Sequence, residues 1–434
     1  MGLIKRIIKI MVWGVVGLYL AAVIMVRTPL VQQWLGGKVA AAIGKKLDTR
    51  VTVDKVHLGL VNKFVVDGID VYDKDDRLMI SASRIAAKID IGRLVGDGRV
   101  LVSSAQVFGF NGVFYQKDGR TKPNYQFVLD SLASKDKSKK TDLMVSINSL
   151  VVRHGAIRFD RYDIPPTPTR FNTAHINISD ISAHIMIPYY TADSSAVSLK
   201  KLSMKEASGL DLRKLNFDLK YDGTHALLTN FNLLLPNTTF GINRLEARYK
   251  KQDGKPDLAT LRYNGEIKSA KVTLADVAYL VPELKTFTTP LYISTTFNGT
   301  STQANMSAVN IHTADGGIKL AGHGRIVHTG QGTAWDAQIG TLDCTAEGIK
   351  QTIEKLPLGG SKLQETLARL GDIHYNGGIG GKQGSLHADG MLDSGIGQAR
   401  LNIKQHGTLI ESHISTGGLE FGSLVGNHKP GRLA

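Results

Sequence analysis

HALLTNFNLLLP (residues 225–236) is the stretch that decides the fold. Its apolar side chains recur at steps of two, at Leu227, Phe231, Leu233 and Leu235, with Thr229 between them and Asn230 and Asn232 in the intervening places. Successive side chains of a strand point to opposite faces, so this spacing predicts one apolar and one polar face. An antiparallel sheet accommodates two such different faces.

The same one-sided alternation recurs along the chain. Further runs are Leu245, Ala247 and Tyr249; Leu291, Ile293 and Phe297; Ile318 and Leu320; Trp335, Ala337 and Ile339; and Ala399, Leu401 and Ile403. The 46 glycines scattered between short apolar runs are typical of a chain with many turns. We therefore expect a mainly β protein, with an antiparallel meander of strands of similar length.

Helical spacing is confined to a few segments. After Pro29, apolar residues follow at steps of three and four as far as Leu47, which predicts an amphipathic helix of about 18 residues. Its apolar stripe needs a surface to cover, either a membrane interface or the open end of a β structure. Thr273 and Asp276 form a capping-box pattern for a short helix before Pro282. Two further stripes predict a helical hairpin within 346–370.

The stretch Ile10–Val26 carries no charge and is long enough to cross a bilayer as a helix. We expect an uncleaved transmembrane signal anchor, with Ile10, Trp13, Leu18, Leu20, Ile24 and Val26 in the span. A cleaved signal peptide is the alternative, although the usual pair of small residues at a cleavage site is missing. Lys5, Arg6 and Lys9 precede the span, so the positive-inside rule places the N-terminus in the cytoplasm.

Charge and cysteine content narrow the class of protein. The chain has 434 residues, with 53 Lys and Arg against 38 Asp and Glu, a formal net charge of +15. In a protein anchored in a membrane, a basic surface of this kind is expected to face anionic lipid head groups or simply to be solvated. We therefore expect no nucleic-acid partner. Cys344 is the single cysteine, so no intrachain disulfide forms.

The sequence carries no recognisable catalytic motif. Patterns of the types GxSxG, HExxH, CxxC and Gly-Lys-Ser/Thr do not occur. The glycine-rich GGIGGKQG, residues 377–384, precedes a predicted strand and so predicts a hairpin rather than a dinucleotide site. His323 and His328, five apart in an alternating strand, face opposite sides and do not suit one metal ion. We expect no enzyme, cofactor or metal; an envelope hydrolase assembled from distant strands remains an alternative.

These features predict the following order along the chain. Residues 1–9 form a basic cytoplasmic tail and 10–26 the anchor. Residues 28–133 hold the amphipathic helix and a first β segment. The polar and charged SKDKSKKT, residues 134–141, forms an exposed linker. Residues 142–434 continue the β structure, with helical insertions near 273–282 and 346–370.

Several segments in this order resemble the AsmA-like superfamily, and most closely the TamB-like translocation and assembly module proteins of the Bacteroidota. The segments are PLVQQWLGGKVAAAIGKKLDTRVTVDKVHLGL (29–60), GIDVYDKDDRLMISASRIAAKIDIGRL (68–94), NYQFVLDSL (124–132), LLLPNT (233–238), LADVAYLVPEL (274–284) and STGGLEFGSLVG (415–426). TamB-like chains are longer and end in a conserved β domain that is absent here, so we expect this chain to correspond to their N-terminal part.

The resemblance implies an elongated, half-open antiparallel sheet, shaped like a taco, whose inner face is an apolar groove. It implies an inner-membrane protein with its bulk in the periplasm. Its function would be phospholipid transport between envelope membranes or outer-membrane protein assembly, with phospholipid acyl chains and a BamA-type outer-membrane barrel as partners. Candidate groove residues are Leu227, Phe231, Leu233, Leu235, Leu291, Ile293 and Phe297. Two alternatives stay open: a closed sandwich core, and a scaffold for an assembly partner that carries no lipid.

Overall fold

The computed structural model of the chain is mainly β-sheet with few helices, which confirms the predicted fold class at this level. It describes residues 13, 14, 17, 24, 25, 27–58, 62–89, 102–132, 148–167, 170–191, 194–330, 332–355, 369–420 and 422. The chain divides into two units. Unit 1 comprises Met1–Pro188 and Lys200–Ser208, and unit 2 comprises Tyr189–Leu199 and Gly209–Ala434.

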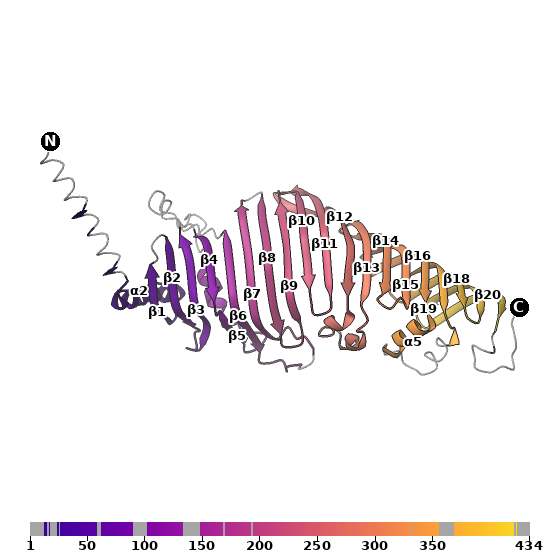
Figure 1. The fold of residues 1–434 in the computed structure, drawn as a ribbon, viewed down its shortest axis with the longest axis horizontal. Helices are drawn as coiled ribbons and strands as arrows, with labels where there is room; N and C mark the ends of the chain where they lie inside the picture. Colours follow the sequence, from indigo (N-terminus) through magenta and orange to yellow (C-terminus); the bar gives the residue numbers. More distant parts are fainter. Residues whose placement is uncertain are drawn as a thin grey trace. The chain divides into compact units, whose positions relative to one another are not determined.

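Figure 1 labels the strands that begin in unit 1 and the helix α2. The elements that begin in this unit are α2 (Pro29–Leu47), β1 (Val51–Leu58), β2 (Lys63–Tyr72), β3 (Leu78–Ile89), β4 (Val102–Phe108), β5 (Asn111–Gln116), α4 (Gln126–Leu132), β6 (Ser149–Arg161) and β7 (His175–Tyr190). The next strand, β8 (Ser195–Glu206), has residues in both units.

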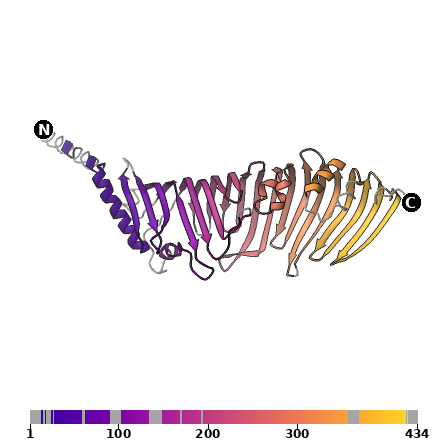
Figure 2. The ribbon, with the colours of Figure 1, turned by 90° about the horizontal axis from the view of Figure 1, so that it is seen from below.

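The helix predicted from the spacing after Pro29 is confirmed as α2, which packs against the first strand (Figure 2). Small residues allow this close approach: a Cβ atom on Gly36 would lie 3.1 Å from the backbone oxygen of Val53. The inner side of α2 therefore covers β structure. Leu47 at its end joins Val71 and Met79 in a buried cluster, against which Phe127 of α4 also packs.

Two pairings in unit 1 depart from the expected antiparallel order. β1, β2 and β3 pair antiparallel, and β3 pairs antiparallel with β4 and β5. β4 and β5, however, both pair parallel with β6, which then pairs antiparallel with β7. Parallel neighbours need a long crossover connection. Residues 117–148 provide it, with α4 inside them, and the predicted linker at 134–141 falls in this connection but outside the described residues.

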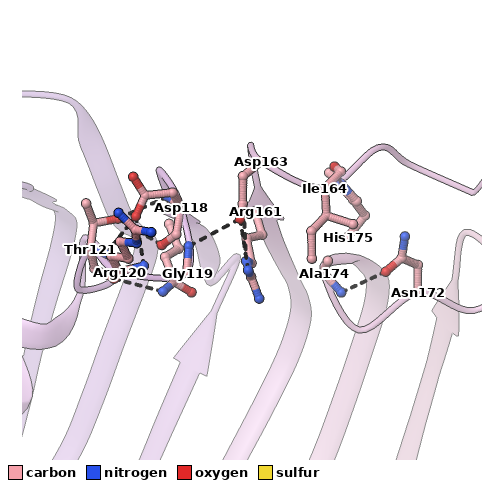
Figure 3. A network of polar contacts seen from close by, with 11 residues as sticks. Asp118, Gly119, Arg120, Thr121, Arg161, Asp163, Ile164, Asn172, Ala174 and His175 are labelled. Carbon is pink, nitrogen blue, oxygen red and sulfur yellow. Dashed lines mark hydrogen bonds and ion pairs between the residues drawn. The ribbon is translucent and has the colours of Figure 1, made fainter.

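The loops that follow β5 and β6 are joined by a polar network (Figure 3). Arg161 donates two hydrogen bonds to the carboxylate of Asp163, at 2.8 and 2.9 Å, and the Gly119 amide donates to the same carboxylate at 3.3 Å. His175 closes the β6–β7 loop: its Nε2 lies 2.6 Å from the oxygen of Ile164, and its Nδ1 lies 2.9 Å from Asp160. These contacts hold the two loops in one arrangement.

Unit 2 is a run of antiparallel strands in chain order, each paired with the next. They are β9 (Asp211–Tyr221), β10 (His225–Leu234), β11 (Thr239–Gln252), β12 (Lys255–Val272), β13 (Leu291–Thr300), β14 (Gln303–Thr313), β15 (Ile318–Thr329), β16 (Gly332–Cys344), β17 (Ile373–Lys382), β18 (Ser385–Ser394), β19 (Gly397–His406) and β20 (Leu409–Leu419). The predicted meander is therefore present in this unit.

Short helices interrupt unit 2 at two places. The 3₁₀ helices η1 (Leu274–Val277) and η2 (Pro282–Thr286) lie between β12 and β13, and α5 (Ala346–Lys355) follows β16. The predicted capping box at Thr273 is wrong, because Thr273 makes no side-chain cap. Its hydroxyl donates instead to the backbone oxygen of Asn237 at 3.2 Å. Residues 356–368, which include most of the second helix of the predicted hairpin, lie outside the described residues.

The predicted membrane anchor at 10–26 also lies largely outside the described residues. Trp13 and Ile24 are described, as helical and exposed, whereas Ile10, Leu18, Leu20 and Val26 are not. Among the helices that the structure does describe, none combines the length and the apolar character needed to cross a bilayer.

Candidate functional site

The register of unit 2 aligns apolar residues across consecutive strands. We call one such line of direct cross-strand neighbours the apolar row. It consists of Leu219, Leu228, Leu245, Gly265, Phe297, Met306, Gly324, Ala337, Ile379, Ala388 and Ile403. No member carries a polar side chain. At about 4.8 Å per strand the row extends over about 50 Å.

A second apolar row lies two residues further along each strand, on the same face. It consists of Tyr221, Ala226, Ala247, Tyr263, Gly299, Ala304, Ile326, Trp335, Gly381 and Leu386. Trp335 is 38% exposed and Leu386 49% exposed. Two adjacent apolar rows make a strip wide enough for a hydrocarbon chain to lie across the strands.

The apolar row is half-buried throughout. Each of its eleven members is of intermediate exposure, and none is in the buried class. In unit 1, by contrast, α2 and α4 pack against the buried cluster that contains Met79, which is 0% exposed. A closed sandwich core would bury the row as completely as Met79, because packed sheets exclude solvent from their inner faces.

The opposite face carries a polar row at the neighbouring positions. It consists of Lys220, Leu227, Glu246, Asn264, Asn298, Asn305, Arg325, Asp336, Gly380, His387, Lys404 and Glu411. Several members are linked by hydrogen bonds: Asn305 donates to Asn298 at 3.0 Å, and Arg325 donates to Asp336 at 2.8 Å. The guanidinium groups of Arg248 and Arg244 lower the pKa of Glu246 to about 2. One face of unit 2 is thus apolar and the other polar.

Aromatic rings fill the gaps that glycines leave on the apolar face. A Cβ atom on Gly265 would lie 2.4 Å from the Phe297 ring, and one on Gly299 would lie 2.5 Å from the hydroxyl of Tyr263. Tyr375 covers Gly377 in the same way, and its hydroxyl donates to the backbone oxygen of Gly378 at 3.1 Å. Burial raises the pKa of this phenol, so it stays a neutral donor. The aromatic rings therefore occupy the space above the glycines, where no side chain projects from the strand.

The predicted groove residues do not all lie on the same part of the sheet. Phe297 belongs to the apolar row, and Ile293 pairs with Ala270 and Ile311, on the same face four residues away. Leu291 lies two residues beyond Ile293, and Leu233 is paired with Leu215 and Phe240. The ring of Phe231 contacts that of Phe240 edge-on, with 6.2 Å between centroids. Leu235 lies in the turn after β10 and is buried, so it belongs to covered core.

The face predicted for Leu227 is not the one that it occupies in the structure. The cross-strand neighbours of Leu227 are Lys220 and Glu246, on the polar face, whereas those of Leu228 are Leu219 and Leu245. The cause is a β-bulge: in the pairing of β10 with β9, the register shifts between Thr229 and Asn232. Asn230 takes the extra place with a φ of 54°, a left-handed conformation that asparagine tolerates. The predicted common face of Leu227 and Phe231 is therefore wrong.

Sequence reasoning missed most of the apolar row, including Leu228, Met306, Ile379 and Ala388. Each belongs to an alternating strand, but its face depends on which residue of the next strand lies beside it. A short hairpin turn sets that register. The lengths of the turns at 222–224 and 383–384 could therefore have predicted which residues of the flanking strands are paired.

Within the described part of the chain, no cluster of three or more His, Cys, Asp or Glu side chains is placed to hold a metal ion. His323 pairs with Gln338 and His328 with Thr333, which puts the two histidines on opposite faces as predicted. Comparisons of the chain with protein-family models, curated proteins and solved structures found no match.

Proposed function

We propose that this chain is an inner-membrane-anchored periplasmic protein whose apolar sheet face binds phospholipid acyl chains, as part of a half-open groove. It acts in lipid transport between envelope membranes or in outer-membrane protein assembly. The observation that supports this proposal is the apolar row, which continues across eleven strands without a polar side chain and is half-buried at every position.

The energetics favour such a surface for an acyl chain. Each methylene group that leaves a bilayer for water costs about 0.8 kcal/mol, so a long chain needs continuous apolar contact while it crosses an aqueous space. A strip of side chains of moderate size provides that contact without one deep pocket. Contact that is nearly uniform along the row also lets the chain slide, because no position binds it much more tightly than the next.

Photocrosslinking from single positions tests this proposal in the full-length chain in membranes. The photoreactive residue p-benzoylphenylalanine replaces Ile403 of the apolar row in one variant and its neighbour Asn402 in the other. Both positions are on β19 and point to opposite faces. We expect a phospholipid adduct from position 403 and little from position 402.

Two results would contradict the proposal: equal lipid adducts from both positions, or no lipid adduct from position 403 in a folded chain. Strong protein adducts in place of lipid would favour the scaffold function. The substitution Ile403→Asp, with Asn402→Asp as its control, extends the test to native mass spectrometry. Phospholipid should be lost from the first variant only.

A further inference from the structure

The glycine-rich strand β17 creates a hollow on the polar face of unit 2. Gly380 lies between Asp336 and His387 in the polar row. In the parallel row two residues away, Lys382 lies between Ala334 and Ser385. The hollow has a volume of about 540 Å³. The lining of this area includes the small residues Ala334, Gly381 and Ser385, together with Val327, Trp335 and Leu386.

Basic side chains surround this hollow. The lining includes Arg325, Lys382, His387, Lys404 and His406. His387 and Lys404 are direct cross-strand neighbours, as are Ser385 and His406. Neighbouring positions on paired strands lie about 5 Å apart, and alternate residues of one strand about 7 Å apart. The lysine side chains are long enough to reach over the small residues of the lining.

The charges in the hollow are not balanced. Among the described residues that line it, Asp336 alone carries a carboxylate, and it is paired with Arg325 at 2.8 Å. In the described part of the chain, neither Lys382 nor Lys404 forms an ion pair, although Glu411 is the cross-strand neighbour of Lys404 on β20. Two ammonium groups are thus left to attract an anion.

Gly380 lies next to the hollow, and its cross-strand neighbour His387 is one of the lining residues. A Cβ atom there would lie 2.5 Å from Cε1 of His387 and 2.9 Å from the backbone oxygen of Trp335. The backbone atom cannot move away without disturbing the sheet, so a side chain at this position would displace His387. Glycine at 380 lets the imidazole lie against the backbone.

We propose that this hollow binds a phosphate group, borne by a small phosphate ester or by the head group of an anionic phospholipid. Ammonium and guanidinium groups donate hydrogen bonds and accept none, which suits the oxygens of a phosphate. Nine of the twelve lining residues belong to the polar face, and Trp335, Gly381 and Leu386 belong to the second apolar row. The test below includes soluble phosphates, so it does not require a lipid chain on the proposed lipid-binding face.

The test titrates the full-length chain, in uncharged detergent, with sn-glycerol 3-phosphate and separately with inorganic phosphate, followed by calorimetry. We expect saturable binding that weakens at least tenfold in Lys382→Gln/Lys404→Gln. Lys250→Gln, which removes an exposed lysine from β11, is the matched control and should bind as the unmodified chain does. A circular dichroism spectrum checks that each variant is folded.

Nanodiscs distinguish the two sources of phosphate. Tighter binding to nanodiscs with phosphatidylglycerol than to those with phosphatidylcholine, lost in the double lysine variant, identifies a lipid head group. Binding of the soluble ester alone identifies a small phosphate ligand. The proposal is overturned if none of these probes binds saturably, or if Lys250→Gln weakens binding as much as the double variant.

Discussion

The ring of Phe297 on β13 lies over Gly265 of the neighbouring strand, so close that a Cβ atom on Gly265 would come within 2.4 Å of Cζ of the ring. The two residues are direct cross-strand neighbours in the apolar row. A glycine normally weakens a strand, because it has no side chain to pack. Here the ring of the next strand packs in its place.

Gly265→Ala tests this relationship. The added methyl group would push the Phe297 ring off the strand, and we expect a loss of about 1–3 kcal/mol in the free energy of unfolding. Urea denaturation followed by circular dichroism measures it. Gly330→Ala is the control, since a Cβ atom there meets nothing within 4 Å. Equal stability of the two variants would contradict the packing described.

A charge on β10 should distinguish its two faces. Leu228→Asp places a carboxylate between Leu219 and Leu245, whereas Leu227→Asp places it beside Lys220 and Glu246. A half-buried charge without a partner is unfavourable, so we expect the first change to destabilise by about 1–3 kcal/mol and the second by less. Thermal unfolding of the two variants gives the comparison. The reverse order would show that the bulge at Asn230 does not invert the alternation.

The loop closed by His175 should loosen as pH rises. Both ring nitrogens face acceptors, Asp160 at 2.9 Å and the oxygen of Ile164 at 2.6 Å. The hydrogen bond with Asp160, followed by that with Ile164, raises the pKa of His175 above its usual 6.5. The stabilisation is therefore complete below pH 6.5 and is lost as pH rises through the raised pKa.

Hydrogen exchange at residues 162–174, corrected for the intrinsic effect of pH, should accelerate over that interval. In His175→Gln, the neutral side chain cannot become a cation, so the acceleration should disappear. Persistence of the same pH dependence in the variant would place the titrating group elsewhere.

Asp276 should hold the turn between β10 and β11. Its carboxylate accepts hydrogen bonds from the backbone amide of Asn237 at 2.8 Å and from its side-chain amide at 3.0 Å. We expect Asp276→Ala to lower the free energy of unfolding by about 1 kcal/mol, because two hydrogen bonds to a carboxylate are lost and water takes its place at this exposed turn. Faster amide exchange at Asn237 is the specific readout. Glu283→Ala, a change on the adjacent η2, should leave that exchange rate unaltered.

Glu246 should contribute stability that acid removes. The neighbouring guanidinium groups of Arg248 and Arg244 hold its pKa at about 2, against an ordinary value of 4.5. The contribution is fully present above pH 4.5 and is lost as pH falls towards 2. The stability difference between the unmodified chain and Glu246→Gln should therefore be present at pH 6 and shrink on acidification. A constant difference would contradict the assignment.

Much of the local structure follows from sequence spacing. The helix predicted after Pro29 is present as α2, and its small residues explain how it packs against Val53. The alternation of Trp335, Ala337 and Ile339 places all three on the apolar face, as it does Ala399, Leu401 and Ile403. Neither run contains an extra residue, so the alternation read from the sequence is kept in the sheet.

Other features depend on contacts between distant parts of the chain. Thr273 and Asp276 have the spacing of a helix cap, yet both bond instead to residues 237 and 238, because the turn after β10 lies beside them. The parallel pairing of β5 with β6 likewise depends on a crossover of about thirty residues. Local sequence spacing identifies neither the residues that Thr273 and Asp276 contact nor the strand that pairs with β5.

The sequence by itself determined that this chain is mainly β, because a period of two can only be satisfied by strands with unlike faces. Only the tertiary structure decided which side chains share a face. A single extra residue in a strand inverts the alternation beyond it, and Asn230 and Ala308 both occupy such positions with positive φ. The apolar row exists because the bulges and turns bring the alternating strands into one register, and that register is a property of paired strands rather than of any one of them.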